Sequence, residues 1–149
     1  MSEFWTHTDH VSFNHNVISF DLDLSVYGER LKKAQFWLDT QVMIDCEPLM
    51  PRQTSTFINL TKARSAAMAG SGEVCVGTPP MGRFLYFGKV MVDPVTGSPF
   101  ARKGAKKVLT DKDLKFWYPG AQAHWFEVAK EQQKDAWVNL VKDILEGRK

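Results

Sequence analysis

The chain has 149 residues, the length of one domain, and its 44% hydrophobic and 24% charged residues are close to the average for globular proteins. About two thirds of the unfolded surface is buried when a chain of this length folds, which excludes a wholly disordered or low-complexity protein. No apolar run approaches the roughly 20 residues of a membrane helix. Residues 1–10 also lack the basic and then apolar pattern of a secretory signal.

Acidic and basic residues are distributed unevenly along the chain. Residues 1–50 carry 3 basic and 8 acidic side chains, residues 51–120 carry 11 and 4, and residues 121–149 carry 5 of each. An acidic first part and a basic middle part favour either association between copies or folding of these two parts against each other, and the sequence leaves both open.

Residues 1–20 are polar with scattered aromatic residues and no sustained periodicity, which predicts an extended N-terminal arm or an irregular β segment. Trp5 and Phe13 are costly to leave in water, so we expect the arm to dock on a neighbouring surface, another subunit included. Three histidines in this arm do not indicate a metal site, because no cysteine or carboxylate cluster completes a ligand set (His7, His10 and His15).

Two amphipathic helices are predicted, over residues 25–47 and 123–146. In each, apolar residues recur every three or four positions, the period of a helix with one buried face. Pro48 ends the first helix because proline donates no backbone hydrogen bond. Phe36 and Trp37 lie off its main apolar stripe, so this helix is expected to make contacts on two sides.

The middle of the chain is predicted as β-structure. Residues 54–68 and 73–77 are expected to form a hairpin around the glycine-containing turn at 69–72, and residues 83–92 a third strand rich in aromatic and β-branched residues. The chain is therefore predicted to be an α+β domain over residues 21–149, with both helices packed on a small antiparallel sheet.

A long connection over residues 93–121, rich in proline and glycine, joins the predicted sheet to the last helix. Connections of this length are uncommon in compact domains without a function, so we expect an inserted loop that is mobile or forms an interface. Val108 and Leu109 predict a short strand inside it, and residues 111–117 a helical turn.

This loop carries a basic cluster followed by aromatic residues (Arg102, Lys103, Lys106, Lys107, Phe116 and Trp117). Basic residues beside aromatic ones are what phosphate contact and base stacking require, so a DNA-binding accessory protein is one hypothesis. The alternatives are a solvated loop, or a loop that pairs with the acidic N-terminal third of a neighbouring copy.

The sequence contains no common catalytic motif, and we expect neither an enzyme nor a bound cofactor or metal. Asp21 and Asp23 have the spacing of metal-binding loops, but no third ligand follows. His124 and Glu127 fall on one helical turn, where a surface histidine is the simpler interpretation. Two cysteines far apart in apolar surroundings predict buried free thiols (Cys46 and Cys75).

Several stretches, in order, carry a resemblance to a known family. They are the helix at 34–42 leading to Pro48 and Pro51, the Gly-Ser-Gly-Glu-Val run at 70–74, Thr-Pro at 78–79, Arg-Phe-Leu-Tyr-Phe-Gly at 83–88, Asp-Pro-Val-Thr-Gly at 93–97, and Ala-His-Trp-Phe-Glu-Val-Ala-Lys at 123–130 with Trp137. Together they resemble the minor capsid proteins of tailed bacteriophages over roughly residues 24–147. Ser55 departs from the pattern, since relatives often carry glycine there.

The resemblance implies a structural virion protein of the head–tail junction, of the neck, head-closure or tail-completion type, assembled in the host cytoplasm. Such proteins form rings, with six copies favoured and twelve an alternative. The implied partners are copies of the chain, the neighbouring portal, adaptor and tail proteins, and genomic DNA that passes without sequence-specific contact; no membrane is implied. The interface candidates are the arm aromatics, the off-stripe pair on the first helix, and the loop cluster (Trp5, Phe13, Phe36, Trp37, Arg102, Lys103, Lys106, Lys107, Phe116 and Trp117).

Overall fold

The computed structural model describes residues 10–15, 18–52 and 55–149, with side chains from Asp23 onward within these ranges. The elements in chain order are β1 (His10–His15), β2 (Ile18–Asp23), α1 (Ser25–Cys46), the 3-10 turn η1 (Glu47–Leu49), α2 (Ser55–Met68), α3 (Gly82–Phe87), β3 (Lys89–Val92), β4 (Val108–Asp113) and α4 (Trp125–Leu145). Helices at both ends of the chain and antiparallel strands confirm the α+β class.

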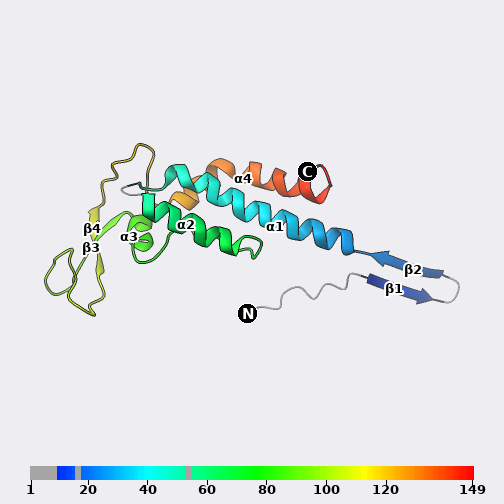
Figure 1. Ribbon diagram of the computed structural model, residues 1–149, viewed down its shortest axis with the longest axis horizontal. Coiled ribbons are helices and arrows are strands. Elements are labelled where there is room, and N and C mark those ends of the chain that lie inside the picture. The colour runs from blue at the N-terminus through cyan, green and yellow to red at the C-terminus, as the bar shows by residue number, and fades with distance from the viewer. Residues whose placement is uncertain (1–9, 16–17, 53–54) are drawn as a thin grey trace.

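The two long helices α1 and α4 lie side by side and run in opposite directions, and they pack mainly on each other (Figure 1). Both helices were predicted within two residues of their observed ends. The strands form two separate two-stranded sheets, so α1 and α4 do not pack together on one sheet. Trp137 on α4 donates from Nε1 to the Asp45 carboxylate on α1 at 2.6 Å, and the Arg30 guanidinium donates to the Leu145 carbonyl at 3.0 Å.

The expected N-terminal arm contains a hairpin in its described part. Strand β1 pairs with β2 in antiparallel register from His10 opposite Asp23 to His15 opposite Ile18. The hairpin continues beyond the first turn of α1, away from the other helices (Figure 1). The ordered strand therefore crosses the boundary predicted at residue 20.

The hairpin predicted over residues 54–77 is wrong, because its first strand is the helix α2 (Ser55–Met68). The buried residues of α2 recur every three or four positions, which is a helical period (Phe57, Ile58, Thr61 and Ser65). Two of the four are polar, which obscured the helical period in the sequence. The buried Thr61 hydroxyl forms a hydrogen bond with the Thr78 hydroxyl at 2.9 Å. Residues 69–72 do form the expected turn, but residues 73–77 form no strand.

The strand predicted at 83–92 is divided between the short helix α3 and the strand β3. Gly88 ends α3 in the left-handed conformation, with φ of 62°, and its N–H donates to the carbonyls of Phe84 and Leu85. Glycine adopts this conformation without steric cost, so a single residue switches the chain from helix to strand.

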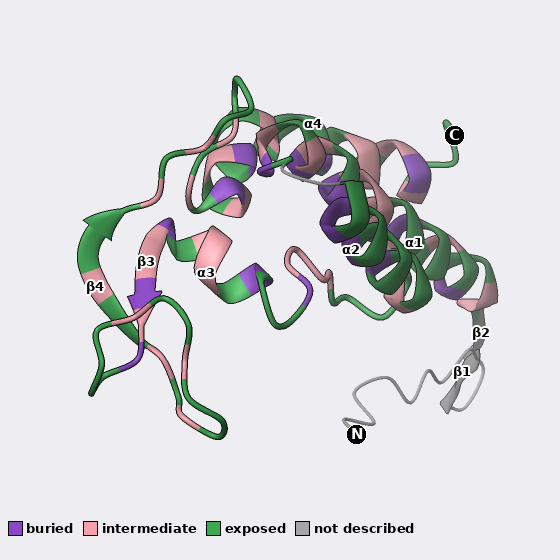
Figure 2. Cartoon of the chain, turned by 60° about the vertical axis from the view of Figure 1, so that its left-hand side comes forward, coloured by how far each residue is buried: buried purple, intermediate pink, exposed green. Residues whose placement is uncertain are grey.

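The long connection after β3 holds the strand β4, which confirms the short strand expected at Val108 and Leu109. These two residues pair with Val92 and Met91 in antiparallel register. The helical turn expected over residues 111–117 is wrong, because β4 continues to Asp113 and irregular backbone follows. Most of β4 is exposed, as its green colour shows (Figure 2).

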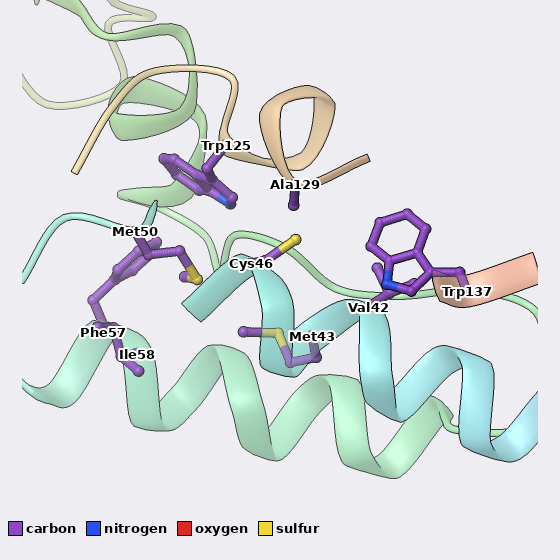
Figure 3. Packing of buried hydrophobic residues seen from close by; sticks show 9 residues of the cluster. All are labelled: Val42, Met43, Cys46, Met50, Phe57, Ile58, Trp125, Ala129 and Trp137. Carbon is purple, nitrogen blue, oxygen red and sulfur yellow. The ribbon is translucent and has the colours of Figure 1, made fainter. Parts of the chain in front are cut away.

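The hydrophobic core lies between the helices and is drawn in Figure 3. Its members come from α1, α2, α4 and the segment after η1 (Val42, Met43, Cys46, Met50, Phe57, Ile58, Trp125, Ala129 and Trp137). Trp125 is fully buried, and its Nε1 donates to the Val76 carbonyl at 2.9 Å. In the part of the chain that the structure describes, no helix is long and apolar enough to cross a membrane.

Both cysteines are free thiols, as predicted, although Cys75 is only half-buried. Burial, with a smaller contribution from the Asp45 carboxylate, raises the pKa of the Cys46 thiol to about 12. Cys46 therefore acts as a small apolar core residue.

The buried Asp39 carboxylate ties α1 to the turn that follows α2. It accepts hydrogen bonds from the backbone N–H groups of Gly70 and Gly72 at 2.8 and 3.0 Å, and from the Gln35 amide at 2.6 Å. Both glycines have positive φ, 95° and 83°, a conformation that turns two amides toward one carboxylate.

Replacing Asp39 by alanine is expected to lower the free energy of unfolding by about 2 kcal/mol, because two backbone donors lose an ionised acceptor. Urea unfolding followed by circular dichroism measures the loss. Asp39→Asn keeps one oxygen acceptor and is the matched control, with a smaller expected loss. Equal stability of Asp39→Ala and the wild type would contradict the role given to this carboxylate.

Candidate assembly surfaces

The strand β4 and the segments on either side of it expose large apolar side chains. Trp117 is 91% exposed and Phe100 is 85% exposed, and four more join them (Val95, Val108, Leu109 and Tyr118). We call these six residues the β4 apolar set; Val95 and Phe100 precede the strand, whereas Trp117 and Tyr118 follow it and lie beside Arg52. A two-stranded sheet has little capacity to bury apolar groups by itself, so these side chains stay uncovered.

Asp93 organises the loop that carries two members of this set, Val95 and Phe100. Its side chain is fully buried and accepts hydrogen bonds from the backbone N–H groups of Val95, Thr96 and Arg102 at 2.8, 3.2 and 3.1 Å. The Arg102 guanidinium adds an ion pair at 3.0 Å. This side-chain hydrogen bond, together with the backbone donors, holds the pKa of Asp93 well below its ordinary value.

The predicted basic cluster is thus divided by the structure. The Arg102 guanidinium pairs with Asp93 in the same loop, and the Lys107 ammonium lies 5.4 Å from the centre of the Phe84 ring. Lys103 and Lys106 are exposed and form no ion pair with any described residue. Two of the four predicted cations therefore remain available to a partner.

The two aromatic residues that follow the basic cluster, Phe116 and Trp117, differ in exposure. Trp117 is almost fully exposed, whereas Phe116 is half-buried in a hollow shared with Leu85 and Pro51. The Arg52 guanidinium lies 4.8 Å from the centre of the Tyr118 ring and supports the outer wall of this hollow. Trp117 is the member of the pair that is free for contact.

Phe36 and Trp37 form a second exposed aromatic surface on α1. They are 45% and 47% exposed, and their rings meet edge to face at 5.8 Å. Phe36 borders a hollow of about 280 Å³ between α1 and α2, and Ile44 lies on the rim of the same hollow. Both side chains are thus accessible, and the second contact side expected for this helix stays a prediction. Trp5, in contrast, lies outside the described residues, and for Phe13 only the backbone in β1 is described.

A larger groove, not anticipated from the sequence, lies between α1, α4 and the segment after the Gly70–Gly72 turn. Its volume is about 790 Å³, and its walls are mainly apolar. Three lysines of α4 are part of its lining (Lys130, Lys134 and Lys142). The sequence indicated the apolar stripe of α4. The opposite wall is held by the hydrogen bonds from Gly70 and Gly72 to Asp39, which join residues 31 and 33 positions apart.

His124 and Glu127 lie near each other, but a third residue defines their arrangement. The Tyr86 hydroxyl donates to the Glu127 carboxylate, and the Tyr86 ring meets the His124 ring at 5.2 Å. Partial burial raises the pKa of Tyr86, and the hydrogen bond to Glu127 adds to this rise; the same bond lowers the pKa of Glu127. A tyrosine that holds its proton and a carboxylate that stays ionised form a stable link between α3 and α4.

Comparison of the chain with models of protein families, with curated proteins and with solved structures finds no match.

Replacing Asp93 by asparagine is expected to loosen the loop over residues 93–102, because the ion pair with Arg102 is lost. The depressed pKa means that the carboxylate stabilises the fold at any pH above its ordinary pKa of 3.8, and that this contribution is lost as the pH falls below that value. The melting temperature of the wild type should exceed that of Asp93→Asn at neutral pH, and the difference should shrink below pH 3.8. A difference that does not change with pH would contradict this assignment.

Proposed function

We propose that this protein is a structural subunit of a tailed-phage virion that forms a ring at the head–tail junction, in the neck, head-closure or tail-completion layer. The observation that carries the proposal is the exposure of the β4 apolar set, in which Trp117 and Phe100 are almost fully exposed. Isolated soluble chains rarely keep such groups in water, and an interface between subunits removes them from it.

The arrangement of the exposed surfaces favours a ring over a simple pair. The β4 apolar set and the Phe36–Trp37 surface lie on different elements, so one copy presents different surfaces to two neighbours. Contacts between unlike surfaces close into a ring when the rotation between copies allows it. Six copies are favoured by the resemblance of the sequence, and portal, adaptor and tail proteins are the expected layers above and below.

The alternative is a DNA-binding accessory protein that uses residues 102–107. The pairing of Arg102 with Asp93 and the placement of Lys107 on Phe84 reduce the cations available to phosphates. A channel that lets DNA slide also gains little from strong phosphate contacts. The loop is therefore assigned to contacts with protein.

Reversing the charge of both free lysines, Lys103→Glu with Lys106→Glu, is expected to reduce particle assembly several-fold while the melting temperature stays unchanged, because both side chains are exposed and unpaired. The measurement is electron microscopy of purified particles with a gold-labelled tag on the C-terminus, which places and counts the copies. Lys103→Arg with Lys106→Arg keeps the charge and is the matched control.

The wild-type label should lie at the head–tail junction as a closed ring. A label scattered over the shell, or absent from particles, would contradict the virion assignment. In that case a steep salt dependence of duplex binding by the purified chain would support the DNA-binding alternative.

A further inference from the structure

The groove between α1 and α4 has the form of a binding site for a segment of chain. Leu38 and Val42 form its α1 wall, Val74 and Val76 its floor, and Trp137, Val138 and Val141 are among the α4 residues that complete it. Val138 is 43% exposed although it lies between apolar neighbours. The groove thus leaves apolar walls in contact with solvent beside a well-packed core.

The α4 side of the groove is strongly basic. Lys130 and Lys134 are one helical turn apart, and Lys142 lies two turns further along the same helix. None of the three forms an ion pair with a described residue. Lys130 interacts electrostatically with Glu127 on its own helix, whereas Lys134 and Lys142 have no such partner among the described residues. Apolar walls beside these lysines select an occupant that is both acidic and apolar.

The N-terminal segment of the chain itself has this composition. Residues 1–22 include three acidic residues, four aromatic residues and neither lysine nor arginine. The acidic residues are Glu3, Asp9 and Asp21, and the aromatic residues are Phe4, Trp5, Phe13 and Phe20. Every stretch of 22 residues that begins after residue 8 carries lysine or arginine, so this charge complementarity points to the start of the chain.

The hairpin formed by β1 and β2 extends beyond the N-terminal end of α1, whereas the groove lies along its later turns (Figure 1). The hairpin of one copy therefore leaves its own groove uncovered and is displayed to a neighbour. We propose that the groove binds the N-terminal segment, residues 1–22, of a second copy of this chain.

This inference rests on the proposed function and names the contact that joins neighbouring subunits. It also revises the expectation from charge distribution, since the acidic start of one copy is matched to lysines of α4 and not to the basic middle of the chain. Because the donor segment and the acceptor groove lie at different places on each copy, the contact propagates from copy to copy and closes into a ring when the rotation between copies allows it.

Two full-length variants test the exchange. Val138→Glu places a carboxylate in the groove and keeps the N-terminal segment, whereas Trp5→Ser with Phe13→Ser weakens the segment and keeps the groove. In sedimentation velocity the wild type should self-associate, and each variant alone should associate about tenfold more weakly or not at all. An equimolar mixture has one intact segment and one intact groove, so it should form a species of twice the 17.0 kDa monomer mass and nothing larger.

Two controls separate this contact from damage to the fold. Val138→Ile keeps the groove apolar and should associate like the wild type, and all variants should keep the wild-type circular dichroism spectrum. Lys130→Gln with Lys134→Gln should weaken association and reduce its salt dependence, because fewer charges then attract the acidic segment.

Three results would overturn the inference: association of Val138→Glu as strong as that of the wild type, failure of the two variants to form the mixed species, or a wild type that stays monomeric at its highest soluble concentration. The last result is expected if the groove is filled by the N-terminal segment of the same copy or by a different protein. The proposed function is judged separately, since a labelled ring in particles that carry Val138→Glu would leave it standing while the exchange fails.

Discussion

The burial of Trp125 at the first turn of α4 is the contact on which the arrangement of the other elements depends. The indole is fully buried, donates to the Val76 carbonyl, and meets the rings of Phe57 and Tyr86 edge to face at 6.4 and 4.9 Å. One side chain therefore fixes α4 to α2, to α3 and to the segment after the Gly70–Gly72 turn. Burial of a ring of this size contributes on the order of 3 kcal/mol, more than a single surface contact supplies.

This contact also explains why one end of the molecule is well packed and the other is not. The helices collect around Trp125 and the core of Figure 3, whereas the end formed by β3 and β4 buries mainly Met91 and Asp93. The distal loop is held by polar contacts to the Asp93 carboxylate, which position the backbone without covering the apolar side chains. The molecule thus combines a well-packed helical body with large apolar side chains on and around β4 that the single chain leaves exposed.

The sequence predicted α1 and α4 because their apolar residues keep a helical period over many turns. It named Trp37 and Trp117 as interface candidates, and the structure leaves both side chains exposed. It misassigned α2 because Thr61 and Ser65, which are polar, occupy buried positions and are satisfied by contacts made only in the folded chain. It also could not separate Arg102 from Lys103, because the partner of Arg102 is a buried aspartate nine residues earlier. The groove was missed for a similar reason, since its walls are brought together by long-range contacts of Asp39.

The central claim is that the exposed aromatic side chains of this chain are covered by neighbouring subunits in an assembly. Hydroxyl-radical footprinting with mass spectrometry, applied to the isolated chain and to purified particles, measures this exposure residue by residue. The account predicts that Trp117, Phe100 and Trp37 are oxidised rapidly in the isolated chain and are strongly protected in particles, while the buried Trp125 reacts slowly in both. Equal oxidation of the three exposed residues in the isolated chain and in particles would contradict it.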